Sequence, residues 1–133
     1  VQRTITLLDM GSIADRRTAG MSQGQQVKAA LGRAIVHKPA NLILDEPTRG
    51  LDIFAVRLLR ELLKRLRAEG LCILMSSHIM AEVAELSDAI TLIAHGRTVT
   101  TGTPAEICAR AGVTSLEDAI VALSASTPER TAA

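Results

Sequence analysis

The sequence predicts an α/β fold in which short parallel strands alternate with helices. Two short apolar runs predict the strands, namely residues 41–45, which two prolines flank, and residues 71–76, which follow a glycine. An amphipathic stretch at residues 53–69 separates the two runs and predicts the connecting helix. Because strands that alternate with helices form parallel sheets covered on both faces, we expect both strands to be buried.

The first part of the chain predicts a weak helix, a loop and a strong helix. Residues 1–9 mix polar and apolar side chains, and residues 15–20 are charged and end in a glycine. Ser22 and Gln25 have the spacing of a capping box, so we expect a helix to begin there. Pro39 ends this helix, because proline lacks the backbone N–H that the next turn would need.

The middle of the chain predicts one long and one short helix. The helix at residues 53–69 ends at a glycine and has an apolar face formed by Val56, Leu59, Leu62, Leu63 and Leu66. Residues 79–86 predict a shorter helix that turns Met80, Val83 and Ala84 inward.

The last part of the chain predicts a hairpin and two helices. Residues 89–94 and 98–101 are strand-like on either side of a glycine-containing turn. Thr103 is expected to cap the next helix, with Pro104 in its first position. Residues 115–123 predict a final helix, whose first serine and the acid three residues later have capping-box spacing. The Ser-Thr-Pro-Glu-Arg stretch at residues 126–130 predicts a frayed tail.

The composition predicts one domain with a sizeable core. The chain has 133 residues, of which 47% are hydrophobic, and a formal net charge of +1. So small a charge gives no strong attraction to nucleic acid, and we expect no nucleic-acid partner. No apolar run approaches the roughly 18 residues of a membrane span, so any membrane contact is expected to go through another subunit. Cys72 and Cys108 are expected to be small buried hydrophobes in a reducing compartment.

Polar side chains follow both predicted strands. Asp45 and Glu46 end the first strand, and Ser77 and His78 end the second. Ligands of parallel sheets bind at such strand ends, where Asp45 could hold Mg²⁺ and Glu46 could polarise an attacking water. His78 could hydrogen-bond a phosphoryl oxygen during transfer. Each residue alone also fits a plain role, as a strand-end cap or an ordinary histidine, and only the pairing of two strand ends favours a site.

A second group of candidate residues begins at Ser22. The stretch Ser22-Gln23-Gly24-Gln25 combines a helix start, a hydroxyl and a glycine. Free backbone N–H groups and the helix dipole make such a start suitable for binding an anion. The same stretch would also form a plain helix cap, so both interpretations stay open at this point.

In their order along the chain, these stretches resemble the motifs of ABC-type ATPases. Residues 22–25 are similar to the signature motif, residues 41–47 to Walker B, residues 48–52 to the D-loop and residues 76–78 to the switch histidine. The D-loop stretch, together with residues 89–107, most resembles transporter ATPases of the branch that includes sodium and drug exporters. The resemblance implies a P-loop NTPase-type, RecA-like parallel sheet with flanking helices.

The resemblance also implies a division of the chain. Residues 1–37 would belong to the helical subdomain that carries the signature, residues 38–101 would be the C-terminal part of the ATPase core, and residues 102–133 would form C-terminal helices and a tail. A phosphate-binding loop, G-x-x-x-x-G-K-[ST], is expected upstream of Val1, because this chain contains no Gly-Lys pair. We therefore expect the fold to be incomplete at its N-terminus, and the isolated chain neither to bind ATP strongly nor to hydrolyse it.

Three candidate residues would act on ATP and Mg²⁺, the cofactors that the resemblance implies. Asp45 would help to hold Mg²⁺. Glu46 would be the general base for the attacking water. His78 would contact the γ-phosphate.

Four further residues would serve a dimer of ATPase subunits. Ser22, Gly24 and Gln25 would reach the γ-phosphate of ATP bound on the opposite subunit. Asp52 would lie at the dimer interface and couple the two sites. Gln23 stands where the signature more often has glycine, which reduces local backbone freedom but leaves Gly24 in place.

The leading interpretation is the ATP-hydrolysing subunit of an ABC-type exporter, present as its C-terminal part. It would pair head to tail with a second ATPase subunit and power a separate membrane permease, lying in the cytoplasm at the inner face of the membrane. Two alternatives stay open. One is half of a related chromosome-maintenance or DNA-repair ATPase, although no heptads precede the signature here. The other is a non-catalytic fragment that binds a partner ATPase.

Overall fold

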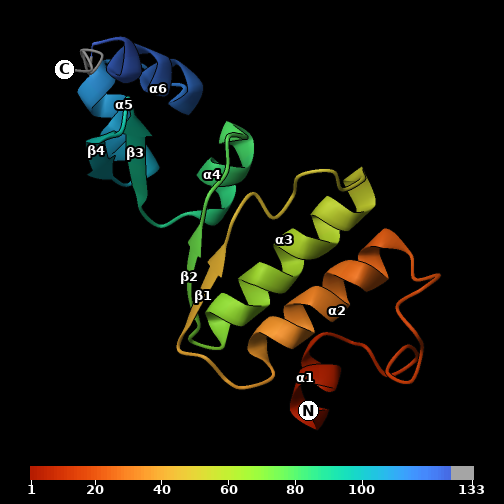
Figure 1. Cartoon of the computed structure of the whole chain (residues 1–133). Coiled ribbons are helices and arrows are strands. Elements are labelled where there is room, and N and C mark those ends of the chain that lie inside the picture. The colour runs from red at the N-terminus through yellow and green to blue at the C-terminus, as the bar shows by residue number, and fades with distance from the viewer. Residues whose placement is uncertain (127–133) are drawn as a thin grey trace. The chain divides into compact units, whose positions relative to one another are not determined.

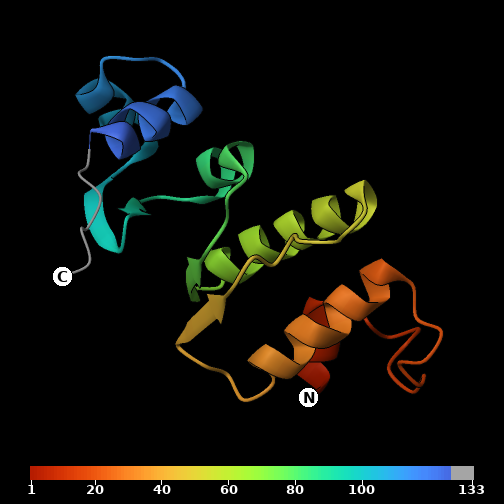
Figure 2. The same ribbon diagram turned by 45° about the horizontal axis from the view of Figure 1, so that its top comes forward.

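A computed structural model describes residues 1–126, which fall into two compact units. The first unit is Val1–Ser77, and the second unit begins at His78. Figures 1 and 2 show the helices and strands of each unit from two directions. The subdivision predicted from the sequence, with boundaries after residues 37 and 101, stays a prediction.

The first unit is a strand–helix–strand arrangement that two helices precede. Its elements in chain order are α1 (Gln2–Leu7), α2 (Gln23–Ile35), β1 (Asn41–Leu44), α3 (Ile53–Ala68) and β2 (Cys72–Met75). Strands β1 and β2 pair in parallel, which confirms the predicted pairing. Helices α2 and α3 lie side by side and run in the same direction, so their N-termini are at the same end of the unit (Figures 1 and 2).

Local signals in the sequence explain where α2 and α3 begin and end. Helix α2 starts with the predicted capping box of Ser22 and Gln25 and ends before Pro39. Asp52 caps α3, because its Oδ1 accepts the backbone N–H of Ala55 at 2.8 Å. Gly70 follows α3 with φ +88°, a conformation that side chains disfavour. The predicted apolar face of α3 is buried at Leu59, Leu62, Leu63 and Leu66 and half-buried at Val56.

The prediction that the first two strands are buried is wrong for one face of their sheet. Leu42 is 5% exposed, whereas Ile43 and Leu74, which are neighbours in the register, are 73% and 66% exposed. Side chains alternate between the faces of a strand. Helix α3 packs against one face, while the described residues of this unit leave the other uncovered. Cys72 points to that same outer face and is exposed, so the prediction of a buried thiol is wrong there.

The second unit contains a hairpin and three helices. Its elements are α4 (Met80–Leu86), β3 (Ile90–Ala94), β4 (Arg97–Gly102), α5 (Pro104–Ala111) and α6 (Leu116–Ala125). Strands β3 and β4 pair antiparallel, which confirms the predicted hairpin. Its two-residue turn is His95-Gly96, with φ of +50° and +72°, values that suit the right-handed twist of a hairpin.

The helices of the second unit pack around a small apolar core. Ile90, Ile107, Leu116 and Ala119 form this core. Thr103 forms the predicted cap of α5, and the Ser115 hydroxyl accepts the N–H of Asp118 at the start of α6.

The inward face predicted for α4 is partly wrong. Ala84 is exposed, and Glu82 is the buried residue at 2% exposure. Val83 packs against the core of the second unit, as predicted. The other residue on the buried side of this short helix is Glu82, whereas Ala84 lies on the exposed side. Apolar spacing alone cannot place the face of so short a helix.

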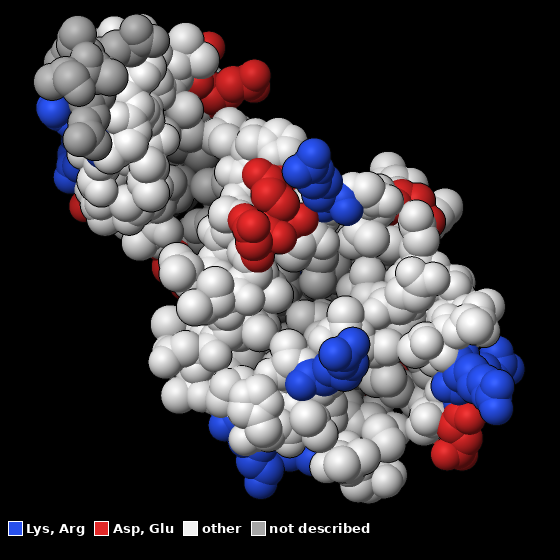
Figure 3. Space-filling model, in the orientation of Figure 1, with Lys and Arg blue, Asp and Glu red and all other residues white. Residues whose placement is uncertain are grey.

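The surface carries charges of both signs. On the face that Figure 3 shows, Lys and Arg side chains and Asp and Glu side chains lie in small separate groups, in agreement with the net charge of +1. Within residues 1–126, every helix is too short or too polar to span a lipid bilayer. The predicted frayed tail lies almost entirely outside the described residues.

Candidate functional site

The carboxyl ends of β1 and β2 bring Asp45 together with Ser76. The backbone N–H of Ser76 donates to the carbonyl of Leu44 at 2.9 Å and extends the parallel pairing by one residue. The Ser76 hydroxyl donates to Oδ1 of Asp45 at 2.6 Å and accepts the backbone N–H of Glu46 at 2.9 Å. One hydroxyl therefore orients two consecutive residues of the predicted site. The sequence analysis did not assign a role to Ser76, although a hydroxyl at the end of the neighbouring strand was a usable signal.

Glu46 has an uncommon backbone conformation. Its φ is +45°, in the left-handed region that residues other than glycine seldom adopt. The Ser76 hydroxyl holds its N–H, and its carbonyl accepts the N–H of Arg49 at 3.0 Å, so hydrogen bonds on both sides of the residue stabilise this conformation. Such strained positions concentrate at functional sites. The backbone at Glu46 is thus consistent with the predicted site.

The oxygen atoms at the strand ends match the ligands that Mg²⁺ takes in proteins. Mg²⁺ is commonly held by one or two protein oxygen ligands, with water and phosphate oxygens completing its coordination. The carboxylate of Asp45 and the hydroxyl of Ser76 supply oxygen atoms of this kind at an exposed edge. In the part of the chain that the structure describes, no group of three or more His, Cys, Asp or Glu side chains could hold a metal. An ion at this edge would therefore take most of its ligands from water and substrate.

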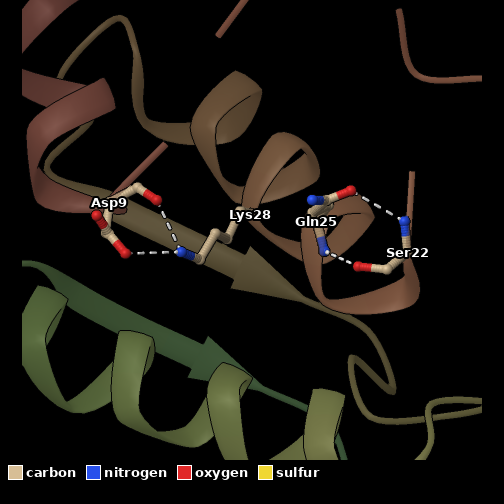
Figure 4. Close-up of polar contacts among 4 residues, drawn as sticks. All are labelled: Asp9, Ser22, Gln25 and Lys28. Atoms are coloured by element: carbon tan, nitrogen blue, oxygen red, sulfur yellow. Dashed lines mark hydrogen bonds and ion pairs between the residues drawn. The ribbon is translucent and has the colours of Figure 1, made fainter. Parts of the chain in front are cut away.

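The start of α2 is fixed by its own capping box (Figure 4). The Ser22 hydroxyl accepts the N–H of Gln25 at 3.3 Å, and Oε1 of Gln25 accepts the N–H of Ser22 at 3.1 Å. The plain-cap interpretation is thus confirmed for these two side chains. Anion binding at the same helix start stays a prediction.

Helix α2 is also attached to the chain that follows α1. Lys28 Nζ donates to the backbone carbonyl of Asp9 at 2.7 Å and pairs with its Oδ2 at 3.3 Å, as Figure 4 shows. The Lys28 side chain is only 16% exposed, so its methylene groups are largely covered. This contact fixes α2 one turn beyond its capping box.

The start of α2 packs directly on α3. A Cβ on Gly24 would lie 3.2 Å from Cδ2 of Leu58, closer than ordinary van der Waals contact, so a glycine allows the close approach of the two helices. Next to it, the Gln23 side chain forms hydrogen bonds with the backbone at Gly50 and Asp52. The structure therefore brings the signature-like and D-loop-like stretches together within the first unit. The sequence analysis missed the Gln23 contact, because it considered only the backbone at that position.

His78 is the first residue of the second unit, and its side chain is exposed. It precedes Ile79, which occupies the N-cap position of α4 without forming a side-chain cap. Its role at the γ-phosphate stays a prediction.

Comparison with known proteins places the chain in a family. A family model described as "ABC transporter" matches residues 1–49. The ABC transporter ATP-binding protein NatA of Bacillus subtilis (strain 168) is 41% identical over 93 residues, which cover 70% of this chain and 38% of NatA. The chain belongs to the ABC transporter ATP-binding family. This confirms the resemblance seen in the sequence.

Two further matches are an exporter ATP-binding protein and a solved structure. The Nod factor export ATP-binding protein I of Rhizobium johnstonii is 42% identical over 93 residues, which cover 70% of this chain and 30% of that protein. A solved structure described as the ATP binding subunit of an ABC transporter matches with a TM-score of 0.74 and 28% identity, over 92% of this chain and 52% of the other. The predicted P-loop NTPase-type fold is thus confirmed. These relatives favour the transporter interpretation over the DNA-repair alternative.

The chain spans only part of the length of its relatives. It covers 38% of the length of NatA and 30% of the Nod factor export protein. The family model covers the candidates at residues 22–25 and 45–46, but not Asp52 or His78. The roles of those two later residues rest on the resemblance of their own motifs.

Proposed function

We propose that this chain is the C-terminal part of the ATP-hydrolysing subunit of an ABC-type exporter. The observation that carries the proposal is the Ser76 hydroxyl, which joins the Asp45 carboxylate to the Glu46 backbone at the ends of two parallel strands. Family membership supplies ATP as the nucleotide, and the Nod factor export relative supports export.

The strand-end residues would divide the work of hydrolysis. Asp45 would hold Mg²⁺, with Ser76 fixing the orientation of its carboxylate. The ion, when bound, neutralises charge that develops on the phosphoryl oxygens. Glu46 would accept a proton from the attacking water, and its backbone, held by Ser76, would aim the carboxylate. His78 would donate a hydrogen bond to a γ-phosphate oxygen.

The starts of α2 and α3 would serve the second subunit of a head-to-tail dimer. Ser22, Gly24 and Gln25 would face the γ-phosphate of ATP bound on that subunit. Asp52 would lie at the interface between the two subunits. Support comes from the close packing of these two helix starts in the first unit.

The partners would be a second ATPase subunit and a membrane permease, with the protein peripheral at the cytoplasmic face of the membrane. The matching solved structure is that of an ATP binding subunit of an ABC transporter, which supports an assembly of this kind. The net charge of +1 and the scattered charges of Figure 3 give no support to a nucleic-acid partner.

The outer face of the β1–β2 sheet would be covered by the rest of the ATPase domain. Ile43 and Leu74 form an apolar pair on this face, and exposed apolar patches of this kind mark surfaces that pack against other protein. The phosphate-binding loop would also belong to that remainder, because the present sequence contains no Gly-Lys pair. The isolated chain would therefore bind ATP weakly and not hydrolyse it. An ATP titration of the isolated chain measures the first of these two properties, the affinity.

The proposed function is tested by replacing Glu46 in the complete protein. Glu46→Gln removes the carboxylate that would act as the general base. It should therefore lower the turnover number for ATP hydrolysis by about 10²- to 10⁴-fold, the usual effect of losing a general base. ATP affinity, measured by equilibrium binding, should stay within about twofold, since a base acts on water rather than on nucleotide. Wild-type turnover in this variant would exclude Glu46 as the base.

A further inference from the structure

The Gln23 side chain forms two hydrogen bonds with a loop far away in the sequence. Its Nε2 donates to the backbone carbonyl of Gly50 at 3.3 Å, and its Oε1 accepts the backbone N–H of Asp52 at 2.9 Å. Gln23 is the first residue of α2, and the loop leads into α3. The carboxamide thus connects the chain segments at the starts of two neighbouring helices.

Both hydrogen bonds require the chemistry of an amide. A carboxamide carries an acceptor oxygen and a donor nitrogen on one planar group, so it can pair with a backbone carbonyl and a backbone N–H in the way that a peptide group does. A carboxylate would keep only the acceptor, an ammonium only the donor, and a thioether neither strong contact. Gly50 has φ +76°, so the chain turns directly before the carbonyl that accepts from Gln23.

The residues on either side of the contact are themselves well fixed. Ser22 and Gln25 close the capping box at the start of α2, and the Asp52 carboxylate caps α3 through the N–H of Ala55. Gly24, the next residue of α2, lies close to the Leu58 side chain of α3. Gln23 therefore joins two rigid helix starts, and a change at Gln23 would alter the position of one relative to the other.

We propose that Gln23 is a positioning residue that clamps the start of α2 to the Gly50–Asp52 loop. The clamp would present the signature-like residues and Asp52 to the opposite subunit in one fixed arrangement. This inference rests on the proposed function for its effect on hydrolysis, although the clamp itself is a property of the first unit. Misplacing groups by about an ångström is enough to slow catalysis, so a change in turnover is expected without any loss of a reacting group.

The first measurement is hydrogen exchange at the Asp52 amide in the complete protein. Gln23→Met removes the acceptor, so this amide should exchange about three- to tenfold faster, as expected for one modest hydrogen bond. Gln23→Glu retains an acceptor, so exchange should stay near the wild-type rate. Gln2→Met is the matched control, because Gln2 is an exposed glutamine of α1 with no side-chain hydrogen bond in the described structure. Unchanged exchange in Gln23→Met would overturn the clamp.

The second measurement is steady-state ATP hydrolysis by the same variants and by Gln23→Lys. The turnover number should be highest in the wild type, intermediate in Gln23→Glu and Gln23→Lys, and lowest in Gln23→Met. For Gln23→Met it should fall by about three- to tenfold, while the KM for ATP should stay within about twofold of the wild-type value. The partial activity of Gln23→Glu and Gln23→Lys is the discriminating result, because each retains one of the two contacts. Wild-type turnover in Gln23→Met, with faster exchange at Asp52, would overturn the positioning role.

The two measurements separate this inference from the proposed function. A wild-type protein without ATPase activity would overturn the proposed function and, with it, the effect of Gln23 on hydrolysis. Faster exchange at Asp52 in Gln23→Met would still support the clamp in that case, since exchange does not depend on turnover.

Discussion

The carboxylates of Asp45 and Glu106 are held in contrasting ways. Asp45 lies at the end of a parallel strand in the first unit, where a neutral hydroxyl, that of Ser76, donates to it. Glu106 lies in the first turn of α5 in the second unit and accepts the backbone N–H of Thr103 at 2.8 Å, while the Thr103 hydroxyl accepts the N–H of Glu106 at 3.2 Å. The first carboxylate is oriented at an exposed edge, and the second is part of a closed capping box.

The capping box and a nearby arginine lower the pKa of Glu106. Hydrogen bonds with the backbone and then the side chain of Thr103, together with the charge of Arg110, hold the pKa of Glu106 below its ordinary value. A carboxylate with a lowered pKa is a weaker base and stays ionised, which suits a structural role. The two acids thus differ in what surrounds them: the hydroxyl of Ser76 donates to Asp45, whereas the backbone and side chain of Thr103 and the charge of Arg110 act on Glu106.

The largest expected effect comes from removing the charge of Asp45. Because the proposed function makes Asp45 the residue that holds Mg²⁺, Asp45→Asn in the complete protein should weaken activation of ATP hydrolysis by Mg²⁺ by more than about 100-fold, which exceeds the usual effect of losing a group that only supports a metal-binding residue. The titration is steady-state hydrolysis against MgCl₂ concentration. Glu106→Gln makes the same chemical change in the second unit and should leave the Mg²⁺ dependence unaltered. Equal shifts in the two variants would break the comparison.

A smaller effect is expected from removing the hydroxyl that orients Asp45. Ser76→Ala should weaken Mg²⁺ activation by roughly tenfold, since a group that supports a ligand typically contributes 10- to 100-fold to metal affinity. Ser115→Ala is the matched control, because that hydroxyl caps α6 and should affect only stability, by about 1 kcal/mol. Mg²⁺ activation that is unchanged in Ser76→Ala would show that Asp45 needs no such support.

The two cysteines, one in each unit, differ in exposure and should therefore differ in reactivity. Cys72 is exposed on the outer face of the β1–β2 sheet, whereas Cys108 is half-buried in α5. In the isolated chain, Cys72 should react with a small thiol reagent about threefold faster or more, because access limits the reaction. In the complete protein, Cys72 should become the slower of the two if the rest of the domain covers that face. Cys72 that stays reactive there would contradict the proposed packing.

Much of the fold could be predicted from local patterns in the sequence. The capping box at Ser22, the cap at Thr103 and the hairpin depend on residues close together in the chain, and all three are confirmed. The parallel pairing of β1 with β2 joins distant residues, but the alternation of strands and helices predicts it, and it is also confirmed. Burial could not be predicted in the same way. Ile43 and Leu74 are apolar and strand-like, but their exposure depends on which segments cover the sheet. The side of α4 that faces the core likewise depends on packing, because seven residues make too short a repeat to define a face.

The candidate site divides along similar lines. The sequence could nominate Asp45 and Glu46, because their motif and position at a strand end are local features. It could not assign Ser76 or Gln23 their contacts, because each is made across about 30 residues and depends on how strands and helices pack. The residues that we propose to act on ATP and Mg²⁺ lie in recognisable motifs, whereas the contacts of Ser76 and Gln23 are found only through the tertiary structure.

The smallest expected effect concerns the pKa of Glu106. Thr103→Ala removes the hydroxyl but keeps the backbone N–H, which is the stronger cause of the lowered pKa, so the pKa should rise only part of the way to its ordinary value. A carbon-detected NMR titration of the Glu106 carboxyl in the complete protein measures this shift, and an unchanged pKa would exclude the hydroxyl as a cause.

The lowered pKa of Glu106 also makes stability depend on pH. Because the pKa of this carboxyl is lower in the folded than in the unfolded protein, its interactions stabilise the second unit at pH values above the unfolded pKa. This contribution is lost as the pH falls through the folded pKa. The stability difference between wild type and Glu106→Gln should therefore narrow on acidification, which thermal unfolding at a series of pH values would detect.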